Sequence, residues 1–327
     1  MTNKIKIIDL FSGPGGLGEG FAAHREIFEI AISIEKDPSA QRTLKLRSFF
    51  RNFDEAPKEY YDFLSGKLGA QPEDSLYGLD KFKKQFANAE QEARLLELGK
   101  DNLEIRNSID KAIGKDECIL IGGPPCQAYS AAGKSKNKGD STYSLEKDPR
   151  SFLYKEYLEI VARYQPAIFV MENVKGMLSA KLNDKSVFDR IYDDLSQPHK
   201  ATTTSPRTGY QSKNYELVSF SVPHEEDDVL SPTDYIIRCE NYSVPQKRHR
   251  VIIFGIRSDL VANWSNELVL EKQKGMVSVE NVIGDLPRIR SGLSKRTNTS
   301  EEWLSYCLLY TSPSPRDRTR SRMPSSA

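Results

Sequence analysis

Short apolar runs alternate with a helical pattern over the first part of the chain. Residues 5–10, "IKIIDL", and 28–35, "FEIAISIE", are rich in β-branched residues, which is typical of strands. Between them, glycines are followed by apolar positions at helical spacing from Leu17 to about His24. Strand, turn, helix and strand in this order predict the start of a doubly wound parallel sheet.

The same pattern continues farther along the chain. Residues 117–123, "ECILIGG", and 167–173, "AIFVMEN", predict two further strands, and 152–164 between them predicts a crossover helix that ends before Pro166. Residues 215–222 and 250–257 are strand candidates with no long helical pattern between them, so we expect an antiparallel pair at the sheet edge.

Three segments interrupt this order. Residues 46–115 are charged and helix-forming, which predicts a helical insertion, and 196–233 are rich in Ser, Thr, Pro and acidic residues, as in exposed loops. The last twenty residues, 308–327, are dominated by Ser, Pro and Arg without periodicity. We expect this tail to be disordered and non-native, and we exclude it from the predicted fold.

Composition excludes several classes of protein. The 327 residues carry 47 Lys and Arg against 46 Asp and Glu, so any nucleic-acid surface must be local rather than global. No signal peptide is recognisable, and no apolar run reaches the ~18 residues of a membrane span. The four cysteines show neither C-x-x-C pairing nor metal-ligand spacing with the four histidines, which favours a reduced, cytoplasmic protein without a metal site.

The turn after the first strand has the spacing of a nucleotide-binding loop. Gly13, Gly15 and Gly18 fit G-x-G-x-x-G, and Glu35 ends the second strand about 20 residues later, where an acid can accept hydrogen bonds from ribose hydroxyls. An ordinary tight strand–helix connection with a surface acid is the alternative. The pattern therefore predicts a nucleoside-bearing cofactor without separating NAD from S-adenosylmethionine.

Three further motifs follow predicted strands or precede one. Cys126 lies in "GGPPCQAYS", where two prolines restrict the backbone; a structural cysteine is the alternative interpretation. Glu172 in "MENVKGM" emerges from a buried strand, where an unpaired acid is costly. Arg248 and Arg250 in "NYSVPQKRHRVIIFGIR" are two residues apart on an extended segment, so we expect them to point to the same side.

With these motifs together, the chain resembles the DNA (cytosine-5) methyltransferases. The glycine turn, Glu35, Pro-Pro-Cys-Gln, Glu-Asn-Val and Gln-x-Arg-x-Arg occur in the family's order between residue 5 and about residue 292. The resemblance implies a Rossmann-like S-adenosylmethionine-dependent methyltransferase fold, with a mostly parallel doubly wound sheet and an antiparallel edge hairpin. The catalytic domain would cover residues 1–295.

The resemblance also implies the reaction. Cys126 would add to carbon 6 of a flipped cytosine, so that carbon 5 accepts the methyl group, while Glu172 would hydrogen-bond nitrogen 3 and the exocyclic amine. Arg250 would reach the base's O2, Arg248 would hold the cysteine loop and a phosphate, and Asn173 would brace that loop.

The remaining expected contacts fall into two sets. The positions matching the family's S-adenosylmethionine contacts are Phe11, Pro14, Gly15, Gly16, Glu35, Lys36, Pro125 and Leu153. The family's adenine-contacting acid could be Glu97, Asp101 or Glu104. Expected contacts with duplex DNA are Gln127, Ser130, Lys134 and Gln246, and residues 128–150 would form a mobile catalytic loop.

One departure from the family pattern concerns the end of the chain. After residues 279–294 the family continues into a target-recognition region, of which 296–307 would be only the start, so we expect this polypeptide to be weakly active or inactive. A tRNA cytosine-5 methyltransferase, a non-catalytic regulator with the same fold and an NAD oxidoreductase are alternatives. We expect a monomer in a prokaryotic, nucleoid-associated restriction–modification system, with no direct contact to a cognate endonuclease implied.

Overall fold

The computed structural model describes residues 4–125, 153–182, 185–223, 230–263, 269–286 and 299–302. Contacts divide the chain into two units, Met1–Met276 and Val277–Ala327. In the second unit, α11 (Val279–Ile283) begins with a capping box, in which the Ser278 hydroxyl accepts from Asn281 N. The first unit contains all other elements below.

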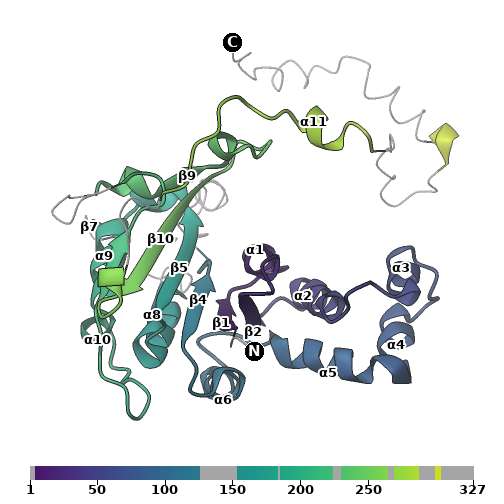
Figure 1. The fold of residues 1–327 in the computed structure, drawn as a ribbon, viewed down its shortest axis with the longest axis horizontal. Helices are drawn as coiled ribbons and strands as arrows, with labels where there is room; N and C mark the ends of the chain where they lie inside the picture. The colour runs from purple at the N-terminus through teal and green to yellow at the C-terminus, as the bar shows by residue number, and fades with distance from the viewer. Residues whose placement is uncertain are drawn as a thin grey trace, which may run out of the picture. The chain divides into compact units, whose positions relative to one another are not determined.

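The first unit is a mixed α/β fold (Figure 1). Its strands are β1 (Ile5–Leu10), β2 (Phe28–Glu35), β3 (Ala93–Leu95), β4 (Cys118–Gly122), β5 (Ile168–Val174), β6 (Lys181–Leu182), β7 (Lys185–Ser186), β8 (Tyr215–Val218), β9 (Ile236–Arg238) and β10 (His249–Arg257). Its α-helices are α1 (Gly16–Ala22), α2 (Pro38–Arg51), α3 (Lys58–Leu64), α4 (Pro72–Tyr77), α5 (Lys83–Glu92), α6 (Asn102–Ile113), α8 (Leu153–Tyr164), α9 (Val187–Ser196) and α10 (Pro198–Ala201). Short 3₁₀ turns are η1 (Asp80–Phe82), η3 (Lys175–Ser179), η4 (Pro232–Tyr235), η5 (Cys239–Tyr242) and η6 (Val261–Asn263).

The main sheet has the order β3-β2-β1-β4-β5-β10-β8, and β9 also pairs with β10. Strands β3, β2, β1, β4 and β5 are parallel, whereas β10 is antiparallel to β5, β8 and β9. The prediction of a mostly parallel doubly wound sheet with an antiparallel edge pair is therefore confirmed. Because these strands are parallel, the carboxyl ends of β1, β2, β4 and β5 lie on the same side of the sheet, where such folds bind their ligands.

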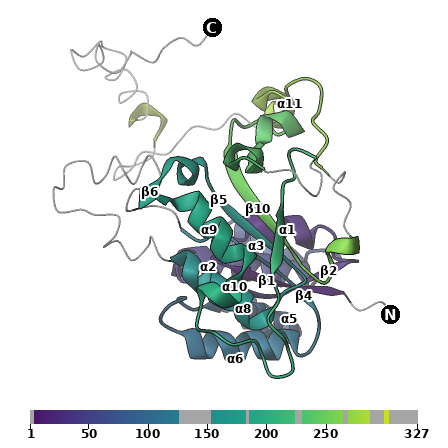
Figure 2. The same cartoon turned by 90° about the vertical axis from the view of Figure 1, so that its left-hand side faces the viewer.

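Apolar side chains cover both faces of this sheet. Because side chains alternate along a strand, Ile8 and Leu10 belong to one core and Ile7 to another. The first core packs against α6, α8 and α9, which lie along the same side in Figures 1 and 2. Leu17 and Phe21 of α1 pack against the second core. The crossover helix α8 buries Tyr157, Leu158, Val161 and Tyr164 at helical spacing, as its sequence predicts.

The segment 46–115 is only partly the helical insertion that we expected. Helices α3, α4 and α5, with the end of α2, enclose a small separate core that contains Phe49, Tyr77 and Phe82. Beyond Glu92, however, β3 pairs with β2, and α6 packs against the sheet. The three residues of β3 are too few for a readable period, which explains the difference. The expected loop at 196–233 likewise contains α10, and the strand predicted at 215–222 is β8.

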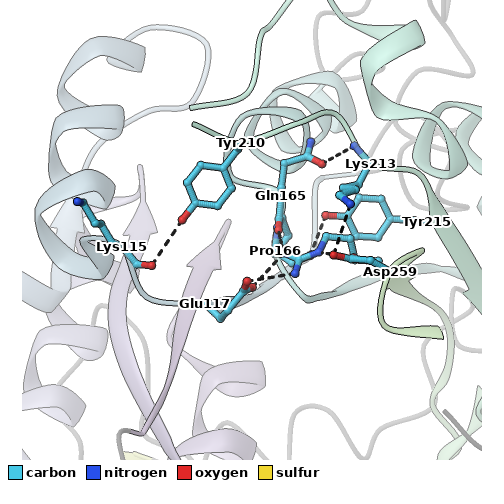
Figure 3. A network of polar contacts seen from close by, with 9 residues as sticks. Lys115, Glu117, Gln165, Pro166, Tyr210, Lys213, Tyr215 and Asp259 are labelled. Carbon is cyan, nitrogen blue, oxygen red and sulfur yellow. Dashed lines mark hydrogen bonds and ion pairs between the residues drawn. The ribbon is translucent and has the colours of Figure 1, made fainter. Parts of the chain in front are cut away.

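Arg257 at the end of β10 joins several elements at the opposite end of the parallel strands, and its partners Glu117, Gln165 and Asp259 are labelled in Figure 3. Its side chain is 8 % exposed, and its two Nη atoms lie 3.0 and 3.1 Å from the Glu117 carboxylate. Its Nε donates to Asp259 Oδ1, and its Nη1 also donates to the backbone carbonyl of Gln165. The guanidinium thereby ties the start of β4 and the end of α8 to the end of β10. None of the helices in the described ranges has the length and apolar character needed to cross a bilayer.

Replacement of Arg257 by methionine is expected to lower the free energy of unfolding by about 3 kcal/mol, because the carbonyl and carboxylates around it lose their shared donor. Urea denaturation followed by circular dichroism measures the change. Lys213→Met is the matched control: Lys213 is 35 % exposed and lies 3.6 Å from Asp259, so its loss should cost less than about 1 kcal/mol. An equal decrease in the free energy of unfolding in both variants would contradict the stabilising role assigned to Arg257.

Candidate active site

The glycine turn between β1 and α1 uses backbone conformations that favour glycine. Gly13 and Gly15 have φ angles of 56° and 92°, and a Cβ on Gly15 would lie 2.8 Å from Leu44 Cδ1. The amide of Ser12 donates to the carbonyl of Ile34 at 3.1 Å, which joins the turn to β2. The turn is thus held close to the end of the neighbouring strand.

Glu35, at the end of β2, fixes the glycine turn with its carboxylate. Its Oε2 accepts from Gly13 N at 2.8 Å, while its Oε1 accepts from Lys36 N at 2.9 Å and from Asp37 N at 2.7 Å. A carboxylate offers roughly four acceptor positions, so one more donor can be accommodated. Glu35 therefore positions the turn in addition to any contact with a ribose.

A cavity of about 100 Å³ opens beside this turn at the carboxyl ends of the strands. Five predicted cofactor residues line it: Phe11, Glu35, Lys36, Pro125 and Leu153. The predicted Pro14, Gly15 and Gly16 lie in the adjacent turn and do not line it. The cavity is completed by Ile34, Leu96, Glu97, Leu98 and Gly123. Sequence analysis missed the apolar members, because an apolar residue at a strand end looks like any core residue.

The three acids left open by the sequence have different surroundings. Glu97 lines the cavity, whereas Glu104 lies 2.8 Å from Arg94 and Asp101 accepts from the backbone amide of Glu97 at 2.7 Å. A hydrogen bond from Lys100 at 2.6 Å, helped by Lys36, lowers the pKa of Glu97. Glu97 is therefore an ionised acceptor at the wall of the cavity.

Glu172 lies near the end of β5, next to the chain that leads toward Cys126. Its Oε1 is 2.6 Å from Arg250 Nε, and its Oε2 would lie 3.1 Å from a Cβ on Gly123. The antiparallel register explains the contact between Glu172 and Arg250. Arg250 pairs with Val174 and Ile252 pairs with Glu172, so Arg250 and Glu172 are diagonal neighbours on the same face of the sheet. The carboxylate is 29 % exposed, so it stays accessible at this edge. The structure thus brings Glu172 and Arg250 together beside the Gly123–Pro125 segment.

Asn173 contacts the same segment from the other side of the β5 backbone. It is 3 % exposed, its Nδ2 donates to the carbonyl of Pro124 at 3.4 Å, and its Oδ1 accepts from Val174 N at 2.8 Å. Arg248 and Gln246 are both exposed and precede β10, with Arg248 N donating to the Gln246 carbonyl at 2.8 Å. Of the two arginines expected to point to one side, only Arg250 has a contact with Glu172.

Several predicted residues lie outside the described part of the chain. These are Cys126, Gln127, Ser130 and Lys134, with the segments 128–150 and 308–327. Of the predicted 296–307 segment, only 299–302 is described. Among the described cysteines, Cys118 is 2 % exposed, and burial raises the pKa of its thiol to about 12, which makes it unsuitable as a nucleophile.

Asp9 is a buried acid that sequence analysis missed. It is 1 % exposed on β1 beneath α1, and its Oδ2 would lie 2.9 Å from a Cβ on Gly18. Neither this oxygen nor the hydroxyl of Ser33, its register partner on β2, has a hydrogen-bond partner among the described residues. Burial raises the pKa of Asp9 from 3.8 to about 8. A single Asp inside the apolar run "IKIIDL" was the available signal.

Comparison with known proteins gives a consistent family. The family model for C-5 cytosine-specific DNA methylase matches residues 92–198 and 231–319. The chain is 29% identical over 305 residues to the type II methyltransferase M.Bpa9945I of Bacillus paralicheniformis, covering 87% of this chain and 61% of that protein. It is 31% identical to the type II methyltransferase M.AquIA of Picosynechococcus, covering 77% of this chain and 72% of that protein.

A solved structure shares the fold. It is assigned as a DNA modification methyltransferase encoded within a prophage of E. coli, with a TM-score of 0.52 and 20% sequence identity. The match covers 88% of this chain and 57% of that one.

Asp9 holds its proton up to about pH 8 in the folded protein, whereas the unfolded chain releases it near pH 4. The contribution of Asp9 to the free energy of unfolding should therefore fall as the pH rises from about 4 to about 8. The contribution of Asp9 to this slope is at most about 1.4 kcal/mol per pH unit. Asp9→Asn should flatten the slope, whereas the exposed Asp193→Asn should not. Urea titrations at several pH values measure it. An unchanged slope in Asp9→Asn would contradict the raised pKa.

Proposed function

This chain belongs to the C-5 cytosine-specific DNA methylase family, and we propose that it transfers a methyl group from S-adenosylmethionine to carbon 5 of cytosine in duplex DNA. The observation that carries the proposal is the placement of Glu172. Its carboxylate pairs with Arg250 beside Gly123, at the start of the Pro-Pro-Cys-Gln loop and next to the cavity that Pro125 lines. The chain spans 61% of M.Bpa9945I, so the activity of the whole protein remains part of the proposal.

The residues of the cavity fit S-adenosylmethionine. Apolar side chains of Ile34, Leu96 and Leu98 suit the faces of an adenine ring, and the ionised Glu97 can accept from its exocyclic amine. The remaining acceptor position of Glu35 can take a ribose hydroxyl. The glycines of the turn let the backbone approach the methionine part. When bound, S-adenosylmethionine supplies an electrophilic methyl group.

Cys126 and Glu172 would activate the cytosine ring, which by itself is a poor nucleophile at carbon 5. The Cys126 thiolate adds to carbon 6, forming a carbon–sulfur bond and moving electron density toward carbon 5. Glu172 hydrogen-bonds nitrogen 3 and the amine, which stabilises the charge that develops as sulfur adds. After carbon 5 has gained the methyl group, loss of its proton to water expels the thiolate. Each bond formed to the enzyme is thereby broken again.

Arg250 and Asn173 would position this machinery. Arg250 orients the Glu172 carboxylate and reaches the O2 of the base, and the hydrogen bond from Asn173 to Pro124 holds the start of the cysteine loop. Arg248 and Gln246 are exposed and available to DNA. Because carbon 5 is inaccessible in a stacked duplex, the base must be flipped out at a cost of a few kcal/mol.

The cellular setting is a further part of the proposal. The named relatives are type II methyltransferases, which supports a restriction–modification system in a prokaryotic cytoplasm, near the nucleoid. A cognate endonuclease would act on the same DNA site without touching this protein. The DNA contacts of Gln127, Ser130 and Lys134 stay predictions, as does the monomeric state.

Removal of the charge on Glu97 tests the cofactor pocket. Glu97→Gln is expected to weaken binding of S-adenosylhomocysteine about tenfold, because the amide cannot supply two acceptor oxygens to the pocket. Isothermal titration calorimetry measures the dissociation constant. Glu104→Gln makes the same chemical change outside the cavity and should stay within about twofold of wild type. If both variants bind alike, Glu97 is not the adenine contact.

Methyl transfer tests the chemistry. Under single-turnover conditions that detect the weak transfer expected of this chain, with labelled S-adenosylmethionine and mixed-sequence duplex DNA, Cys126→Ser is expected to abolish transfer, and Glu172→Gln to lower its rate about 10²-fold. Cys239→Ser changes a half-buried cysteine outside the proposed machinery and should keep the wild-type rate. Transfer that survives in Cys126→Ser, or that labels tRNA instead of DNA, would overturn the proposal.

A further inference from the structure

A second, larger cavity lies at the opposite end of β2. Its volume is about 530 Å³, which is within the range of pockets that hold small molecules. On β2, residues 28–31 line this cavity, whereas Ile34 and Glu35 line the cofactor cavity. The two cavities have no lining residue in common, although Arg94 of this cavity is the register partner of Ile34. They are therefore distinct but neighbouring sites.

Four helices and the start of the sheet form the walls, and Ala22 comes from the end of α1. Arg51 comes from the end of α2, Gln91 and Glu92 from the end of α5, and Lys111 from the last turn of α6. In Figure 1, α2, α5 and α6 lie near β2 and the N-terminus. Because the walls come from separate elements, the side chains converge from several directions, which is what an enclosed ligand requires.

The charged side chains that line the cavity are mostly cationic. They are Lys4, Arg25, Arg51, Arg94 and Lys111, with Glu29 and Glu92 as the acids. Arg94 pairs with Glu104 at 2.8 Å, and Arg25 lies 3.5 Å from the fully exposed Asp54. Neither Lys4 nor Lys111 has an ion pair with another described residue within the first unit. Exposed ion pairs are worth little, so a bound anion can compete with them.

The floor of the cavity is held rigidly. Arg51 contacts the carboxylates of Glu19 and Glu92, and Glu92 also accepts from the Ser48 hydroxyl at 2.6 Å. Asn88 donates to Asn52 at 2.8 Å, so amide groups also line the cavity. A rigid floor with cations around the rim needs little rearrangement to receive a ligand.

We propose that this cavity binds a small phosphorylated anion, up to the size of a nucleotide. Phosphate oxygens accept from several cations at once, and Arg25 and Arg94 offer guanidinium forks that match them. The amides of Asn52, Asn88 and Gln91 supply donors and acceptors for the rest of the molecule. The site does not depend on the proposed methyl transfer, because it shares no lining residue with the cofactor cavity.

Inorganic tripolyphosphate is a suitable probe, because it has no nucleoside that could enter the cofactor cavity. Calorimetry at low ionic strength should show binding to the full chain, weakened at least about tenfold in Lys4→Glu/Lys111→Glu. Lys181→Glu/Lys200→Glu reverses the same number of charges on exposed lysines outside the cavity and should bind like wild type. Binding of S-adenosylhomocysteine should be equal in all three proteins, which verifies folding separately.

The remaining outcomes overturn the proposal. One is no tripolyphosphate binding to the wild-type chain, and another is equal weakening in both double variants, which would indicate non-specific attraction. A third is loss of affinity for a short DNA duplex in Lys4→Glu/Lys111→Glu, measured by fluorescence anisotropy. That result would make the cavity rim a nucleic-acid contact instead of a site for a small anion.

Discussion

The pairing of β10 with β5 is the constraint on which the proposed site depends. Because β10 runs antiparallel to β5, Arg250 near the start of β10 lies beside Glu172 near the end of β5. Arg250 Nε is 2.6 Å from Glu172 Oε1. A shift of the register by one residue would turn Arg250 to the other face of the sheet and leave Glu172 without its cation. The partly exposed carboxylate would then lose the contact that orients it. The position of one edge strand thus decides the geometry of a group that lies on another.

The parallel part of the sheet brings the other components to the same edge. The glycine turn follows β1, Glu35 ends β2, and Gly123–Pro125 follow β4. Each strand end is then fixed to a neighbour by a polar contact: Glu35 with Gly13, and Asn173 with Pro124. The result is a set of short, cross-connected segments around a cavity that five predicted cofactor residues line. Such polar contacts restrict the loop segments to one geometry around the cavity.

Buried acids mark both ends of the α1 region. Asp9 lies beneath the glycine turn, its Oδ2 has no hydrogen-bond partner among the described residues, and burial raises its pKa. Glu92 lies by the second cavity, where burial raises its pKa in spite of its contact with Arg51. Arg51 also contacts Glu19 of α1, so the helix that follows the glycine turn is joined to the floor of the second cavity. Burying these groups costs stability, and each lies next to a cavity or turn to which we assign binding.

The sequence by itself determined β1, β2, β4, β5, β8 and β10, the crossover helix and the family, because strand periodicity and motif spacing are local properties. It also determined five of the ten residues that line the proposed cofactor cavity, since residues at strand ends converge in any parallel sheet. Only the tertiary structure placed Glu97, rather than Asp101 or Glu104, at the wall of the cavity, and brought Arg250 rather than Arg248 to Glu172. It also placed β3 and α6 in the sheet layer instead of the helical insertion. It alone revealed Asp9 as a buried acid and the cavity at the start of β2. These features depend on contacts between segments far apart in the chain, which no local pattern of residues encodes.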